Sequence, residues 1–162
     1  MDVFDCAIKM EKEARGYYLE LASNAANEEL KNLFSMLAQA EQEHHDALVR
    51  VKGSHAAPHK LRFTALDQAE CLFKPLLEKR GLVAQLHSDP DAYRLVVGQE
   101  ERGVRFYEEL AARTEDEDAR QVLLEIAREE RKHLSIVENI YAFVESPKTF
   151  LAWGEFSNLK EY

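Results

Sequence analysis

The sequence is poor in the residues that build thiolate metal sites, disulfide-rich folds and tight turns. Its two cysteines, Cys6 and Cys71, are far apart and form no Cys-x-x-Cys pair. Their spacing excludes a zinc ribbon or a four-cysteine iron site within this chain. The chain has only 6 glycines and 4 prolines in 162 residues. With long stretches rich in Ala, Leu, Glu, Lys and Arg, this composition favours helices over many short strands.

Long apolar runs and an excess of basic residues are also absent. No apolar run approaches the ~20 residues of a membrane span. The first residues, MDVFDCAIKMEKEA, show neither the basic start nor the apolar segment of a secretory signal. The formal net charge of −9 argues against non-specific nucleic-acid binding and against docking on anionic membranes. We therefore expect a cytoplasmic protein with two free thiols and with neither a nucleic-acid nor a membrane partner.

Four segments show the three- and four-residue spacing of apolar side chains that predicts amphipathic helices. They cover about residues 2–26, about 27–53, a third segment that opens at Asp89-Pro90, and about 116–144. A connection of roughly residues 54–88, with a short helix around 65–79, joins the second helix to the third. The expected fold is all-α: one domain, residues 1–145, that forms a four-helix bundle with a long crossover between helices 2 and 3. Residues 146–162 are expected to form a short C-terminal helix that packs on the bundle or on a second subunit.

The two halves of the chain are related by a shift of 89 positions that needs no gap. Acidic, imidazole and phenol side chains coincide under this shift: Glu11 with Glu100, Tyr18 with Tyr107, Glu41 with Glu130, and His44 with His133. A pseudo-two-fold axis between two helix pairs would explain the relation. Such an axis would bring the polar residues of both halves to one place.

Six polar residues occupy helix positions at which the apolar stripe predicts Leu or Ile: Glu11, Glu41, His44, Glu100, Glu130 and His133. Burying one unpaired carboxylate costs several kcal/mol, and no Lys or Arg stands at the stripe positions to pair with these four. Four carboxylates and two neutral imidazoles together carry a charge of −4. Because two divalent cations cancel that charge, the pattern predicts a site for two metal ions.

The spacing of these residues also indicates which metals would bind. In each Glu-x-x-His pair the two side chains project from one helix face. One Glu from each of two helices, with Glu-x-x-His from each of the other two, is the ligand pattern of ferritin-like di-iron and di-manganese bundles. Carboxylate and imidazole ligands without thiolate suit iron, manganese or a mixed iron–manganese pair, with zinc as a substitute. Magnesium and calcium would prefer oxygen ligands alone.

The stretches AIKMEKEARGYYLELA, LFSMLAQAEQEH, QEERGVRFYEELA and LLEIAREERKH resemble the rubrerythrin-like branch of the ferritin-like superfamily, as does the final WGEFSNL. The resemblance implies a ferritin-like bundle with a di-iron centre. It further implies that Glu41 and Glu130 bridge the metals, that Glu11 and Glu100 are terminal ligands, and that His44 and His133 bind one metal each.

The resemblance implies an activity as well, namely reduction of hydrogen peroxide, or of O2, by the reduced metal pair. Full-length rubrerythrin carries a Cys-rich rubredoxin domain that this chain lacks, so an external electron donor such as a rubredoxin-like or flavin protein is expected. The family also has an additional Glu where this chain has Gly103. We expect a homodimer or small homo-oligomer. The alternatives are a ferroxidase or iron-handling protein of ferritin type, and a metal-binding module without enzymatic activity.

Two further pairs of residues allow both a structural and a functional interpretation. Tyr18 and Tyr107 follow the Glu of their own stripe by seven residues, and are either core aromatics or catalytic-site donors to the ligand carboxylates. Ala14 and Gly103 stand one turn after the same Glu residues. They either permit close helix packing or leave room for peroxide or O2 at the metals.

Overall fold

The computed structural model describes residues 3–25, 28–53 and 90–145. Within these ranges the chain forms four helices and no strand: α1 (Val3–Asn24), α2 (Glu28–Gly53), α5 (Pro90–Arg113) and α6 (Glu117–Glu145). The expected all-α four-helix bundle is therefore confirmed. The crossover expected at residues 54–88, its short helix, and the C-terminal helix expected at 146–162 lie outside the described residues.

Local interactions explain where α6 begins. The side chain of Asp116 caps the helix, because its Oδ1 accepts a hydrogen bond of 2.7 Å from the backbone N–H of Ala119. Glu117 and Asp118 in the first turn place negative charge at the positive end of the helix dipole. Helix α2 is similar, with acidic residues in its first turn and basic residues in its last. The expected start near residue 116 thus follows from capping chemistry.

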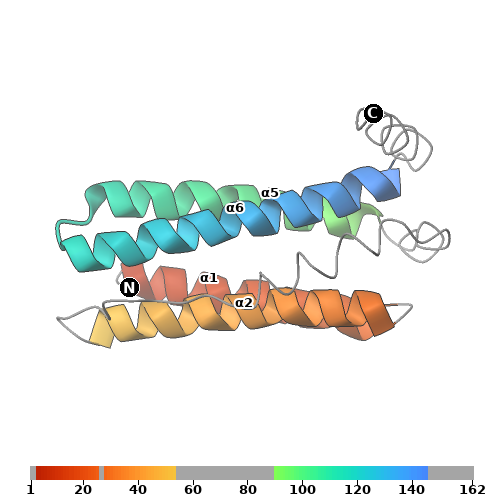
Figure 1. Ribbon diagram of the computed structural model, residues 1–162, viewed down its shortest axis with the longest axis horizontal. Helices are drawn as coiled ribbons and strands as arrows, with labels where there is room; N and C mark the ends of the chain where they lie inside the picture. Colours follow the sequence, from red (N-terminus) through yellow and green to blue (C-terminus); the bar gives the residue numbers. More distant parts are fainter. Residues whose placement is uncertain (1–2, 26–27, 54–89, 146–162) are drawn as a thin grey trace, which may run out of the picture.

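The helices are arranged as two antiparallel hairpins that face each other (Figure 1). Helix α1 packs along α2, and α5 packs along α6. Across the bundle α1 runs opposite to α5, and α2 runs opposite to α6 (Figure 1). This is the arrangement that a two-fold axis perpendicular to the long axis of the bundle would generate, in agreement with the internal repeat.

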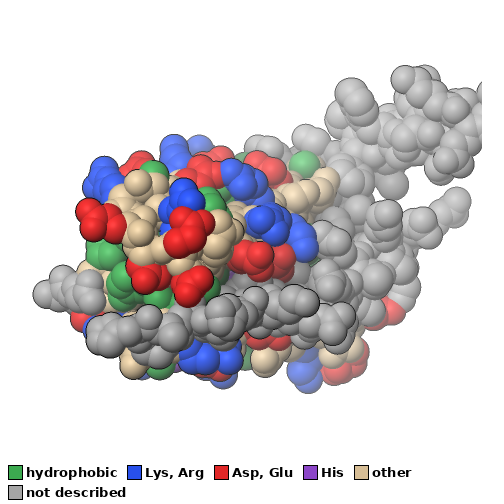
Figure 2. Space-filling model, turned by 60° about the vertical axis from the view of Figure 1, so that its left-hand side comes forward, with side chains coloured by type: hydrophobic (Ala, Val, Ile, Leu, Met, Phe, Trp, Pro, Cys, Tyr) green, Lys and Arg blue, Asp and Glu red, His purple; other side chains and the backbone are tan. Residues whose placement is uncertain are grey.

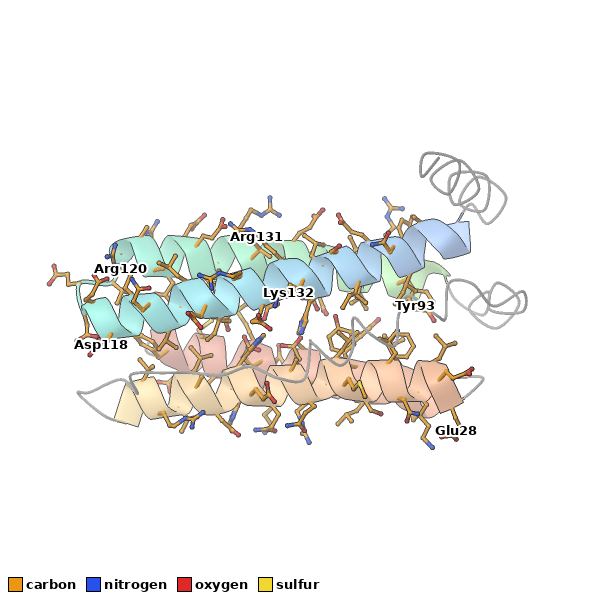
Figure 3. The ribbon with its side chains drawn as sticks, viewed as in Figure 1. Glu28, Tyr93, Asp118, Arg120, Arg131 and Lys132 are labelled. Atoms are coloured by element: carbon orange, nitrogen blue, oxygen red, sulfur yellow. The ribbon has the colours of Figure 1, made fainter. Side chains whose placement is uncertain are left out.

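The apolar core consists of two separate clusters. One cluster contains Phe34, Leu37 and Val137, together with Tyr93. The other contains Leu48 and, from α5 and α6, the residues Tyr107, Leu110, Leu123 and Ile126. Figure 3 shows Glu28 and Tyr93 toward one end of the bundle and Asp118 and Arg120 at the other. Each large apolar side chain buried in these clusters stabilises the fold by about 1.5–3 kcal/mol. Helix α2 contributes to both clusters, and Glu41 and His44 lie on it between the two.

The surface contributes much less to stability. Acidic and basic side chains are interspersed over the end of the bundle that Figure 2 brings forward. Exposed pairs such as Lys31 with Glu28, 3.4 Å between Nζ and Oε1, are worth about 0–1 kcal/mol each. None of the described helices combines the length and apolar character that a membrane-crossing segment needs.

Candidate metal centre

The six acidic and imidazole residues singled out by the sequence meet in the middle of the bundle. All are buried, and none is more than 4% exposed. Each of the four helices contributes: Glu11 from α1, Glu41 and His44 from α2, Glu100 from α5, and Glu130 and His133 from α6. The polar layer they form lies between the two apolar clusters along α2.

The ligand atoms of these residues form two groups of four. Within each group the atoms all lie within 4.8 Å of one another. Two carboxylates, Glu41 and Glu130, belong to both groups. Glu11 and His44 complete one group, while Glu100 and His133 complete the other. The 89-residue shift converts one group into the other, so the site has the pseudo-two-fold symmetry of the bundle.

Each imidazole reaches the shared carboxylate of the opposite hairpin. His44 Nδ1 lies 2.8 Å from Glu130 Oε1, and His133 Nδ1 lies 2.8 Å from Glu41 Oε1. Within its own helix, His44 Nδ1 is 3.6 Å from Glu41 Oε2. The two rings stack with centroids 5.5 Å apart and an interplanar angle of 28°. The Glu-x-x-His pairs therefore form one connected cluster rather than two separate ones.

Both tyrosines donate hydrogen bonds to carboxylates of the cluster, and they do so across the bundle. The hydroxyl of Tyr18, on α1, donates to Glu100 Oε1 on α5, and that of Tyr107, on α5, donates to Glu11 Oε1 on α1. Burial, followed by the charge of the facing carboxylate, raises the pKa of both phenols well above the usual 10.0. Both hydroxyls therefore keep their protons at neutral pH and act as donors. A role in catalysis stays a prediction.

Burial, mutual repulsion and the neighbouring imidazole of His133 govern the protonation of Glu11, Glu41 and Glu130 when no cation is bound. Burial, and then repulsion from Glu41, raises the pKa of Glu11 to about 8. Burial, with repulsion from Glu41 and Glu100, likewise raises the pKa of Glu130. Burial alone would raise the pKa of Glu41 as well, but the charge of the His133 imidazole, whose Nδ1 lies 2.8 Å from Glu41 Oε1, holds it below its ordinary value. The metal-free cluster thus retains protons that a bound cation would displace.

The donor set fits a pair of divalent cations. Among the described residues, several buried ligand atoms form no hydrogen bond of acceptable geometry: Glu11 Oε2, Glu41 Oε1, Glu130 Oε1 and both ring nitrogens of His133. Each buried polar atom without a hydrogen-bond partner lowers the free energy of unfolding by about 1–3 kcal/mol. Two cations placed in the two groups would occupy these lone pairs and cancel the four negative charges.

Metal uptake should release protons and weaken in acid. Below its pKa of about 8 the Glu11 carboxyl is mostly protonated, and it must lose that proton before it can bind a cation. Lowering the pH from 8 to 6 should therefore weaken binding at that group by up to about tenfold per pH unit. Calorimetry of Zn²⁺ binding in buffers of different ionisation enthalpy measures the protons released. A value of zero at pH 7 would contradict the assignment of Glu11.

Removing the hydroxyl of Tyr18 and removing that of Tyr107 should weaken metal binding by about the same factor. Tyr107→Phe leaves Glu11 without its donor, and Tyr18→Phe does the same to Glu100. Loss of such an outer partner costs about 10–100-fold in metal affinity. Because the pseudo-two-fold axis relates the two hydrogen bonds, both variants should fall in this range when Zn²⁺ affinity is measured by competition with a chelator. An effect in only one variant would contradict the symmetric arrangement.

A pocket of about 410 Å³ opens between α1 and α5 and reaches the cluster. All four cluster carboxylates line it, and neither imidazole does. Ala14 and Gly103 both line the pocket, as expected if their small size leaves room beside the metals. A Cβ atom at Gly103 would lie 3.4 Å from Glu130 Oε2, so the backbone of α5 runs directly past this shared carboxylate.

Some pocket residues were not singled out by the sequence. Met10 and Phe106 both line the pocket, but neither belongs to the regular apolar stripe. The one available signal was their position, since Met10 immediately precedes Glu11 and Phe106 immediately precedes Tyr107. Glu129, next to Glu130, is also buried, at 8% exposure, and belongs to neither group of ligand atoms.

Comparison with known families gives a match over most of the chain. The family model described as Rubrerythrin matches residues 2–141, a span that holds all six cluster residues and both tyrosines. Among curated proteins and solved structures no match was found.

Proposed function

Because the chain belongs to the rubrerythrin family, we propose that it is a di-iron oxidoreductase that reduces hydrogen peroxide, or O2, at the buried cluster. One observation carries the proposal above all others: two groups of ligand atoms share the carboxylates Glu41 and Glu130. Shared carboxylates can bridge two cations, and a pair of redox metals can deliver the two electrons that peroxide reduction requires.

Each residue of the cluster then has a stated task. Glu41 and Glu130 would be shared between the two ions, Glu11 and His44 would complete one coordination site, and Glu100 and His133 would complete the other. The iron pair, when bound, supplies electrons and Lewis acidity. Manganese or a mixed pair would suit the same ligands, and zinc would occupy them without redox activity. The two apolar clusters keep bulk water out of the layer from both ends of the bundle, so that the pocket between α1 and α5 is the route by which solvent and substrate reach it.

The protein also has to deliver protons, since peroxide accepts two electrons and two protons to become two molecules of water. Tyr107 and Glu11 line the pocket, whereas Tyr18 is not part of its lining. The Tyr107 hydroxyl donates to Glu11, so this pair holds a proton at the pocket wall. We assign to Tyr107 the transfer of that proton, and to Tyr18 the orientation of Glu100.

Turnover requires that the metals be reduced again. The sequence contains only two cysteines, too few for a four-cysteine iron site of its own. We propose a rubredoxin-like or flavin protein as the electron donor, and a homodimer or small homo-oligomer in a reducing cytoplasm as the working assembly.

Anaerobic titration tests the proposed reaction. Protein loaded with two ferrous ions should develop ferric absorbance that reaches its maximum at one hydrogen peroxide per metal pair. Zinc-loaded protein is the matched control and should show no change. An absence of ferric absorbance in the iron-loaded sample would reject the peroxidase proposal. A large hollow assembly that accumulates many irons per chain would indicate iron storage instead.

A further inference from the structure

The pocket between α1 and α5 is much larger than hydrogen peroxide requires. Its volume is about 410 Å³, whereas one water molecule in the liquid takes up about 30 Å³ and hydrogen peroxide only modestly more. Pockets of about 300–1,000 Å³ are typical of sites that enclose small organic molecules. The volume includes the space that two bound metal ions would take up beside the four carboxylates, and what remains is large enough to admit a small organic molecule.

The lining of the pocket changes from polar to apolar to acidic with depth. Side chains that are exposed, and therefore lie at its mouth, come from Glu13, Gln99 and Arg102. Half-buried apolar side chains follow: Met10, Ala14 and Phe106. The fully buried part consists of Gly103, Tyr107 and the four cluster carboxylates. A ligand that matches this order has an apolar body and a small polar group that reaches the metals.

The apolar section is a fixed wall. The ring of Phe106 packs edge-on against the ring of Tyr107, with centroids 5.3 Å apart and an interplanar angle of 79°. Tyr107 is in turn held by its hydrogen bond to Glu11. A substrate body that contacts Phe106 would therefore stand beside the phenol to which we assign proton transfer.

Charge selects the polar group of the ligand. With two divalent cations bound, the four carboxylates and two imidazoles have no net charge, so the site gives an anionic substrate no general attraction. The four cluster carboxylates already balance the charge of two divalent cations, so a carboxylate on the ligand would add a buried negative charge without a partner. A neutral group that can accept electrons from the metals fits better, and a hydroperoxide group, –OOH, is such a group.

We propose that the preferred substrate is an organic hydroperoxide with a compact alkyl or aryl group, which the pocket holds against Met10, Ala14 and Phe106. The inference rests on the proposed function and specifies its substrate class. In the reaction, ROOH + 2 e⁻ + 2 H⁺ → ROH + H2O, the O–O bond breaks and both oxygens are reduced. The two electrons would come from the reduced iron pair held by the six cluster residues, one from each ion. One proton completes the alcohol and the other completes the water.

Competition between two oxidants provides the first test, with cumene hydroperoxide and hydrogen peroxide as the probes. Burial of one phenyl group should raise kcat/KM for cumene hydroperoxide at least about tenfold above that for hydrogen peroxide. Ala14→Leu, which fills the apolar section, should lower this ratio at least about tenfold. Gly16→Leu is the matched control, because a Cβ at Gly16 meets no atom within 4 Å and the residue lies on the exposed side of the same helix.

A binding measurement provides a second test that does not depend on turnover. The alcohol product 2-phenyl-2-propanol, added to zinc-loaded protein, should shift the amide NMR signals of Ala14 and Gly103 in a saturable way. The dissociation constant obtained from the Gly103 shift should be unchanged in Gly16→Leu. In Ala14→Leu it should be at least about tenfold larger.

The outcomes separate this inference from the proposed function. Oxidation of the ferrous protein by hydrogen peroxide, with no preference for cumene hydroperoxide and no shifts at Ala14 or Gly103, would overturn the substrate class and leave peroxide reduction standing. Oxidation by neither compound would overturn both. Preference for cumene hydroperoxide that Ala14→Leu removes and Gly16→Leu preserves would support the inference.

Discussion

Glu130→Ala should reduce the metal content from two ions per chain to at most one. Glu130 is one of two carboxylates that belong to both groups of ligand atoms, and it is the residue that His44 Nδ1 approaches to 2.8 Å. In the proposed site its removal would take a ligand from both metals at once. The affinity for the metal pair should therefore fall by more than the about 10–100-fold that loss of an outer partner costs. Elemental analysis of protein equilibrated with Fe²⁺ or Zn²⁺ measures the stoichiometry.

The neighbouring residue offers a matched control. Glu129 is buried and acidic like Glu130, but its Oε1 pairs with Lys132 Nζ at 2.9 Å and it belongs to neither group of ligand atoms. Glu129→Ala should keep two ions per chain. The far-ultraviolet circular dichroism of both variants should remain helical, because the two apolar clusters are unchanged. Two ions retained by Glu130→Ala would contradict the assignment of Glu130 as a shared ligand.

The sequence was sufficient to predict the members of the cluster because each one interrupts an apolar stripe. A charged side chain at a position that predicts Leu is a strong local signal, since burial without a partner costs several kcal/mol. The internal repeat then supplied the second half of the cluster without any knowledge of the helix axes. The start of a helix could also be predicted where the sequence provides a capping side chain, as Asp116 does for α6.

The pairing of residues across the bundle was not predictable from these patterns. Tyr18 shares a stripe with Glu11 but donates to Glu100. The reason is that the two-fold axis places the middle of α1 beside the middle of α5. Which carboxylate a phenol reaches depends on how far α1 lies from α5 and on their relative direction. Neither quantity is encoded in the periodicity of a single helix.

The pocket escaped prediction for a related reason. It exists because α1 and α5 pack on their own hairpin partners rather than closely on each other. Its apolar section uses Met10 and Phe106, which lie beside the core stripe and not within it. The residues that select a substrate can thus be read only after the separation of the two helices is known, whereas Ala14 and Gly103 were recognisable from their size alone.

Removal of the metals should lower the melting temperature of the protein substantially. Each ion present at about 1,000 times its dissociation constant stabilises the fold by about 4 kcal/mol, so that two ions contribute about 8 kcal/mol. For a domain of this size about 1 kcal/mol corresponds to about 2–4 °C. Treatment with a chelator should therefore lower the melting temperature by roughly 15–30 °C, and addition of Zn²⁺ should restore it. Differential scanning calorimetry of the two forms measures the shift.

The decrease in melting temperature on removal of the metals should become larger as the pH rises. The pKa of Glu11 is about 8 in the folded metal-free protein against 4.5 for an ordinary glutamate. Between these values the folded state binds more protons than the unfolded state, so the stability of the metal-free protein falls as the pH increases through this window. The raised pKa values of His44 and His133 act in the same direction above pH 6.5, their ordinary value. In the metal-loaded protein the cations replace these protons and the dependence should be much weaker. A metal-free protein that gains stability between pH 5 and 8, or a melting temperature that ignores the chelator, would mean that the four carboxylates do not need cations to remain buried.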